Sequence, residues 1–297
     1  MKTLKNVYHR LRNRYPALRM LRVDQAWFGN IVPLKTNLDY LRYQKQCRKQ
    51  YSAPVLNGFS SKVREATDHF RKQGYVLLHP DYDPLLLKTI LDRCEEMSKN
   101  GLTKVAEGEE WFINFNESMK NVPEIARLIN DEVTAVVEAC FESNFKIYSS
   151  EIYRIVPTSK PPSISGLWHT DNYPPGVYKI MVYLTPCNKK TGALGLHPRA
   201  STRRLLRAGF FDRFNAGRFQ ERLNQDGIQI EGPAGTVLFW NSNLIHRANP
   251  PLDGFRDVVA FKLLPSWEPW DEHFVRARDR VSYEQRNRQV PIDPSVD

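Results

Sequence analysis

The sequence predicts an α+β fold with a mainly β core: a double-stranded β-helix (jelly roll, cupin-like) with helices packed outside it. Apolar residues recur at helical spacing in segments between about residues 62 and 141, and short strand patterns dominate from about residue 145 onward. Helices that precede a run of short strands are typical of a β core covered by helices.

Three helices are expected ahead of most of the strands, over residues 62–72, 84–99 and 123–141. Ser60 or Ser61 can cap the first helix, because a serine hydroxyl accepts a backbone N–H at a helix start. The other two open on a proline, which is favoured in the first turn. Their apolar residues fall on one stripe, so we expect that stripe to face the core.

The expected strands cover residues 75–79, 146–156, 178–184, 228–230, 236–240 and 257–264. Residues 199–231, rich in Arg, Phe and Gly, form an insertion among them. Two interpretations of this insertion stay open: a segment that shapes a substrate pocket, or a surface helix. His197 precedes it in a Leu-His-Pro turn, and we expect this histidine on the surface.

The net charge of +10 is concentrated in residues 1–50, which hold twelve of the 43 Lys and Arg residues and two of the 33 acids. The thirty-one basic and thirty-one acidic residues that remain balance each other. We therefore divide the chain into a basic N-terminal arm, 1–50, and a jelly-roll domain, 51–297, that includes the helices and the insertion.

The arm supports several interpretations. Leu4, Val7 and Leu11 recur at helical spacing among basic residues, which is typical of a helix on an anionic membrane surface. The same pattern fits a helix that packs on the main domain, or an organelle transit peptide. Nucleic-acid binding is not favoured, because no nucleic-acid motif accompanies the charge.

The chain has no run of about 18 apolar residues, the minimum for a spanning helix, and no apolar secretory segment at its start. Its four cysteines are widely spaced, which favours reduced thiols. We expect a cytoplasmic protein, with peripheral attachment to the inner face of a membrane through residues 1–50 as an open alternative.

Three residues have the types and spacing of metal ligands. His169 and Asp171 are two apart, so on an extended strand their side chains leave by the same face. His246 follows a later strand, where the chain turns back. Two imidazoles and one carboxylate on one face of a metal leave the other face open, an arrangement that suits Fe(II).

Three further residues are candidates for holding a co-substrate. Arg256 opens the strand after His246, and a guanidinium there can bind a carboxylate through two parallel hydrogen bonds. Lys179 and Tyr153 lie on neighbouring predicted strands and are included as cofactor-binding candidates, against a purely structural role.

These motifs resemble the Fe(II)/2-oxoglutarate-dependent dioxygenases of the phytanoyl-CoA dioxygenase type. Phe70 to Leu78 is similar to the opening strand motif of that family, and Tyr183 to Leu194 is similar to its hairpin. The resemblance implies that His169, Asp171 and His246 hold Fe(II). It also implies that Arg256 binds the distal carboxylate of 2-oxoglutarate and that dioxygen is the oxidant.

Two positions depart from the family pattern. Residues 198–201 read Pro-Arg-Ala-Ser where the family has Pro-Gly-Ser-His. Ala248 stands where a small hydroxyl residue often helps to bind 2-oxoglutarate, so a second contact must come from elsewhere.

The resemblance implies an oxygenase that hydroxylates an unactivated C–H bond of a small-molecule or lipid- or sugar-linked substrate, with conversion of 2-oxoglutarate to succinate. The carboxylate of Asp171 leaves no ligand position vacant for a halide, which favours hydroxylation over halogenation. The alternative is a non-catalytic jelly-roll protein that binds a metal or ligand and is held at an anionic surface by its basic arm.

Overall fold

A computed structural model describes residues 34–51, 59–161 and 164–270. Ten strands form two antiparallel sheets in this part of the chain. The main sheet runs, in spatial order, β1 (Tyr75–Leu78), β8 (Val237–Asn241), β5 (Tyr178–Tyr183), β10 (Arg256–Ser266), β4 (Asn144–Ile155), β3 (Glu109–Phe115) and β2 (Thr103–Ala106). The smaller sheet runs β7 (Ile228–Ile230), β6 (Leu194–Leu196) and β9 (His246–Arg247).

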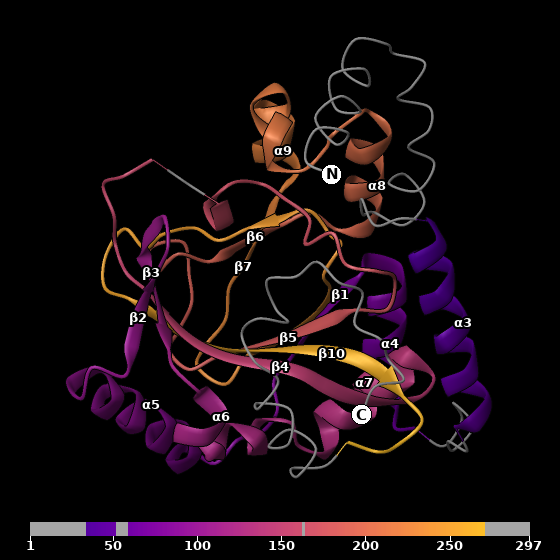
Figure 1. Ribbon diagram of the computed structural model, residues 1–297, viewed down its shortest axis with the longest axis horizontal. Coiled ribbons are helices and arrows are strands. Elements are labelled where there is room, and N and C mark those ends of the chain that lie inside the picture. The colour runs from indigo at the N-terminus through magenta and orange to yellow at the C-terminus, as the bar shows by residue number, and fades with distance from the viewer. Residues whose placement is uncertain (1–33, 52–58, 162–163, 271–297) are drawn as a thin grey trace, which may run out of the picture.

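The two sheets form the core of a jelly roll, as the sequence predicts (Figure 1). Strands far apart in the sequence pair with one another: β5 lies between β8 and β10, and β10 lies between β5 and β4. Isolated bridges from His169 to His246 and from Cys187 to Gly232 extend the pairing of the smaller sheet. Residues 164–270 supply the whole smaller sheet and three of the seven strands of the main sheet.

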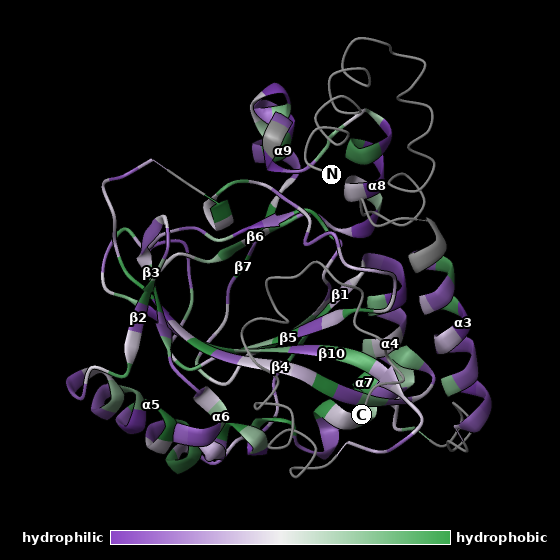
Figure 2. Cartoon of the chain, in the orientation of Figure 1, coloured by the Kyte–Doolittle hydropathy of each residue, from purple (hydrophilic) through white to green (hydrophobic). Residues whose placement is uncertain are grey.

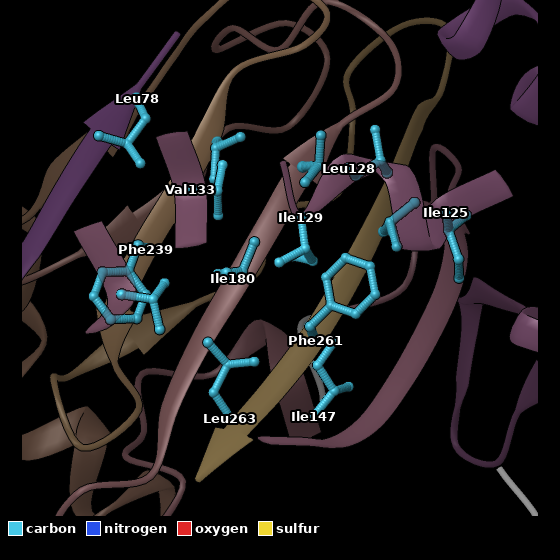
Figure 3. Packing of buried hydrophobic residues seen from close by; sticks show 14 of the residues in the cluster. Leu78, Ile125, Leu128, Ile129, Val133, Ile147, Ile180, Phe239, Phe261 and Leu263 are labelled. Atoms are coloured by element: carbon cyan, nitrogen blue, oxygen red, sulfur yellow. The ribbon is translucent and has the colours of Figure 1, made fainter. Parts of the chain in front are cut away.

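The main sheet buries its outer face against helices. Alternate residues of its central strands, among them Ile180, Phe239 and Phe261, meet apolar residues of the segment that follows β3 (Figure 3). The opposite face belongs to a second apolar cluster that includes Met181, Trp240 and other residues between the two sheets. The period of two along each strand thus separates a helix-covered face from an interior face.

Three helices cover the outer face: α4 (Ser61–Gln73), α5 (Pro84–Lys99) and α7 (Asp131–Phe141). The hydroxyl of Ser60 caps α4 by accepting the N–H of Val63, as expected. The prediction of one helix over 123–141 is wrong. A 3₁₀ helix, η3 (Pro123–Leu128), ends before Asn130, whose side chain caps α7 by accepting the N–H of Val133.

A hairpin of β2 and β3, which the sequence analysis did not predict, sits at one edge of the main sheet. The short helix α6 (Ser118–Asn121) follows it, and the hydroxyl of Ser118 accepts the N–H of Ile152. Strand β2 is poorly buried and carries Lys104, so its hydrophobic pattern is weak. This weakness explains why the hairpin could not be recognised.

Part of the basic arm belongs to the folded domain. Residues 34–50 form helix α3, which buries Tyr40, Tyr43 and Cys47 and leaves most of its charged residues exposed. Its Gln44 side chain donates to the Pro175 carbonyl. For this segment the structure supports packing on the main domain. The expected helix that carries Leu4, Val7 and Leu11 lies outside the described residues.

The insertion folds as helices α8 (Arg199–Arg207), η5 (Arg213–Phe219) and α9 (Gln220–Asp226), on the side of the smaller sheet (Figure 1). Hydrophilic and hydrophobic residues share the surfaces of α8 and α9 (Figure 2). Their apolar residues pack around Trp168 and Ile245. None of the described helices is long and apolar enough to cross a membrane.

Candidate active site

The two histidines are held as neighbours by their own backbones. His169 N donates to His246 O at 2.9 Å, and His246 N donates to His169 O at 2.8 Å. Each ring is then oriented by a carbonyl two residues earlier: Nδ1 of His169 lies 2.7 Å from Leu167 O, and Nδ1 of His246 lies 2.8 Å from Leu244 O. A carbonyl can only accept, so both Nδ1 atoms carry the proton and both Nε2 lone pairs are available to a metal.

Asp171 completes the set. One ligand atom from each of the three residues lies within 4.8 Å of the others, close enough for all three to bind one ion. Oδ1 of Asp171 lies 3.7 Å from Nε2 of His246, whereas Oδ2 lies 2.6 Å from Nζ of Lys179. The carboxylate thus presents one oxygen toward the histidines and the other to the lysine.

The protonation states suit a metal at neutral pH. Burial, followed by the neighbouring His246, lowers the pKa of His169 to about 3. Burial likewise lowers the pKa of His246. Burial alone would raise the pKa of Asp171, but the ammonium of Lys179 and the two imidazoles hold it below its ordinary value. Two neutral imidazoles and a carboxylate are the forms that bind a divalent cation.

These residues line a cavity of about 160 Å³ that draws its walls from both sheets. The main sheet contributes alternate residues of its interior face, which is why the lining residues on β4 and on β10 are two apart. The lining residues are Phe112, Ser149, Glu151, Tyr153, Ser165, His169, Asp171, Lys179, Met181, Leu194, Trp240, His246, Ala248, Ala260 and Lys262.

Arg256 is not among the lining residues of this cavity. It lies on the interior face of β10, fully buried, and its Nη1 contacts the Gly192 carbonyl and the Cys187 sulfur. Its Nε and Nη2 are buried and have no hydrogen-bond partner. A guanidinium with two unpartnered N–H groups fits a carboxylate, which accepts two parallel hydrogen bonds.

Tyr153 places a hydroxyl group in the same cavity as Ala248, which has none. Tyr153 lines the cavity and stacks on Phe112, with the ring centroids 4.4 Å apart. Its hydroxyl makes only a long contact, 3.9 Å, to the sulfur of Met181. The hydroxyl of Tyr183, by contrast, already donates to the Ile230 carbonyl at 2.8 Å. Tyr153 is therefore the tyrosine with hydrogen-bonding capacity left for a ligand.

The residues beside the ligands turn away from the cavity. Trp168 packs in the cluster formed by the insertion, and the guanidinium carbon of Arg247 lies 4.6 Å from its ring centroid. The prediction that His197 lies on the surface is wrong: it is fully buried, with ring nitrogens near Ser201 Oγ and Leu223 O. Burial lowers the pKa of His197 to about 4. The insertion packs against Trp168 and Ile245, the residues just before His169 and His246. None of its described residues lines the cavity.

Ser149, Glu151, Trp240 and Lys262 are among the cavity residues that were not predicted as site residues. The indole N–H of Trp240 is buried without a partner. A lysine in the middle of an apolar strand is the one signal in the sequence that could have indicated Lys262. Ser149 and Glu151 lie four and two residues before Tyr153, and so on the same strand face.

The phytanoyl-CoA dioxygenase (PhyH) family model matches residues 70–252, more than half of the chain. The chain belongs to the phytanoyl-CoA dioxygenase family. It is therefore an enzyme of the 2-oxoglutarate-dependent non-haem iron oxygenases, as the sequence analysis expected. The matched region contains His169, Asp171 and His246 and ends just before Arg256. A comparison with curated proteins gave no match.

Solved structures of similar fold include SnoK, a non-haem α-ketoglutarate-dependent carbocyclase from nogalamycin biosynthesis (TM-score 0.55, 17% identity, 72% of this chain and 87% of that chain). HygX from Streptomyces hygroscopicus, with nickel, 2-oxoglutarate and hygromycin B bound, aligns with a TM-score of 0.54 and 16% identity over 70% of this chain and 90% of that chain. EctD from S. alaskensis, with bound Fe, aligns with TM-score 0.53 and 17% identity over 77% and 88%. At these identities the likeness shows the shared fold.

Proposed function

We propose that this PhyH-family enzyme hydroxylates a C–H bond of a small molecule. The observation that carries the proposal is the convergence of two neutral imidazoles and one carboxylate in one cavity. The same cavity is lined by polar side chains of the main sheet, among them Tyr153 and Ser149. When bound, Fe(II) with 2-oxoglutarate and dioxygen supplies the oxidation: one oxygen atom enters the substrate C–H bond, the other enters succinate, and carbon dioxide is released.

The residues of the chain have distinct roles in this proposal. His169, Asp171 and His246 hold Fe(II) on one face. Arg256 turns Nε and Nη2 to the distal carboxylate of 2-oxoglutarate, since both N–H groups are buried without another acceptor. Tyr153 donates its hydroxyl to the same co-substrate, and Lys179 steadies the free oxygen of Asp171. Met181, Trp240 and Ala260 exclude water from the substrate side.

The test is consumption of 2-oxoglutarate by the full chain with Fe(II) and oxygen, scored as succinate, with candidate substrates screened for products heavier by one oxygen atom. His169→Ala, Asp171→Ala and His246→Ala should each lose bound iron and succinate formation, because one missing ligand spoils both affinity and geometry. Elemental analysis checks the iron independently of turnover.

Each outcome decides a different part of the proposal. Wild-type iron content in all three variants would refute the ligand assignment. Succinate formation with a product that is an isomer of the substrate, or two hydrogen atoms lighter, would keep the oxygenase site and refute hydroxylation.

A further inference from the structure

Two lysines face each other on neighbouring central strands. Lys262 on β10 and Lys179 on β5 are register partners, and both side chains line the cavity. Residues directly opposite in an antiparallel pair have Cβ atoms roughly 5 Å apart, and like charges in that position destabilise a sheet. The stability of the sheet therefore does not explain a pair of ammonium groups on its interior face, and a role in binding would.

Each lysine forms an ion pair with one carboxylate. Lys179 lies 2.6 Å from Oδ2 of Asp171, and Lys262 lies 3.3 Å from Oε1 of Glu151. The charge of Lys262 is held firmly: burial alone would lower its pKa, but Glu151, Tyr173 and Asp171 raise it above its ordinary value. One of the two carboxylates paired with the lysines, that of Asp171, belongs to the proposed metal site.

Iron binding changes this balance. Asp171 must then share its single negative charge between Lys179 and the metal. Two negative charges on 2-oxoglutarate and one on Asp171 offset Fe(II) and Arg256. The charges that remain are two lysines against Glu151. The total of one positive charge in excess is the same before and after loading, because Fe(II) and 2-oxoglutarate cancel, but loading moves the excess from Arg256 to the two lysines.

The chain also provides a hydroxyl at this end of the cavity. Ser149 is the register partner of Lys262 on the other side, its side chain lines the cavity, and its Oγ is buried without a hydrogen-bond partner. The strand register shifts immediately beyond this pair, where Lys262 faces Ser149 but Leu263 faces Ile147. Such a bulge ends the run of cavity-facing residues and returns the next ones to the core.

We infer that Lys179, Lys262 and Ser149 form an anion-binding site that recognises a carboxylate or phosphate group of the substrate. The inference rests on the proposed function, because the excess charge falls on the lysines once 2-oxoglutarate pairs with Arg256 and iron with Asp171. Glu151 keeps Lys262 oriented, and the hydroxyl of Ser149 donates to the same anion. The substrate is thus a small molecule with one anionic group at the end of the cavity away from Arg256.

The test uses the full chain loaded with Fe(II) and 2-oxoglutarate without oxygen, and reads the visible charge-transfer absorption of that complex. The probes are butyrate, ethyl phosphate and the uncharged butyramide. One variant combines Lys262→Met with Glu151→Gln, so that no unpaired carboxylate is left in the cavity. Lys262→Arg keeps the charge, and Lys88→Met removes an exposed lysine that is paired with Asp92 on α5.

In wild type and in Lys88→Met, at least one anion should perturb the absorption at lower concentration than butyramide. The preference of butyrate against ethyl phosphate identifies the anion. The double variant should bind that anion about tenfold to a hundredfold more weakly, the effect of losing a hydrogen bond to a charged group. Lys262→Arg should retain most of the binding, and the absorption should form in every variant.

Three results would overturn the inference. One is anion binding by the double variant at wild-type strength. Another is equal binding of butyramide. The third is displacement of 2-oxoglutarate by the anions, seen as loss of the absorption, which would assign the lysines to the co-substrate. Failure of the absorption to form in wild type would instead refute the proposed function, and the anion site with it.

Discussion

Replacement of Arg256 by methionine should have opposite effects on the free and the loaded enzyme. Methionine has a flexible unbranched side chain that can fill much of the same space without a charge. In the free protein the guanidinium is fully buried, with Nε and Nη2 unpartnered. In the loaded protein, we propose, these same groups bind the distal carboxylate of 2-oxoglutarate.

The magnitudes follow from those contacts. Each buried polar group without a partner costs about 1–3 kcal/mol, so removal of two such groups relieves about 2–6 kcal/mol. The variant also deprives the Gly192 carbonyl of its donor, which costs about 1–3 kcal/mol. The net result is a free protein more stable by about 1–3 kcal/mol. Loss of two charge-assisted hydrogen bonds should weaken co-substrate binding by on the order of a hundredfold to ten-thousandfold.

Thermal unfolding without oxygen, with and without Fe(II) and 2-oxoglutarate, measures both effects. Wild type should gain stability with 2-oxoglutarate, since a ligand that binds only the folded state stabilises it. Arg256→Met should start from an equal or higher midpoint and gain little. Arg256→Lys should recover part of the gain, because an ammonium cannot form the bidentate pair. An undiminished gain in Arg256→Met would refute the assigned role.

Three further substitutions test other parts of the structure. Gly195→Ala places a Cβ 2.8 Å from the ring of buried Trp168. The free energy of unfolding should fall by about 1–3 kcal/mol, and metal titration should show a weaker Fe(II) affinity. Wild-type Fe(II) affinity would mean that this packing does not position the site. Tyr40→Ala should lower the free energy of unfolding by about 3 kcal/mol, whereas Leu41→Ala, at an exposed position of the same helix, should lower it by less than about 0.5 kcal/mol. Equal losses in the two variants would show that α3 does not stabilise the domain. Tyr153→Phe should raise the Kd of 2-oxoglutarate about threefold to tenfold, and unchanged affinity would remove the hydroxyl from the co-substrate site.

The centre of the site was predictable because its residues follow local rules. His169 and Asp171 share a face by the period of two along an extended chain, and His246 follows a strongly apolar strand. The helix cap at Ser60 is equally local, since it needs only a hydroxyl before an amphipathic segment. The break before Asn130 was missed because apolar residues continue on both sides of it.

The rest depends on which strands become neighbours. Tyr178 to Tyr183 and Arg256 to Ser266 are far apart in sequence, and nothing within either strand indicates that Lys179 and Lys262 are register partners. His197 was misplaced for a similar reason: its turn looks exposed until the insertion folds over it and Leu223 accepts from its ring. Burial of a polar residue by a distant segment has no local sequence pattern.

Strand β10 connects the two ends of the proposed reaction site. Arg256 and Lys262 are six residues apart on its interior face, a span of about 20 Å at roughly 3.4 Å per residue. The strand pairs with β4 on one side and β5 on the other, and Phe261 anchors its outer face in the core. A strand held on both edges and one face cannot shift one end alone. The proposed anchors for co-substrate and substrate are therefore kept at a fixed separation.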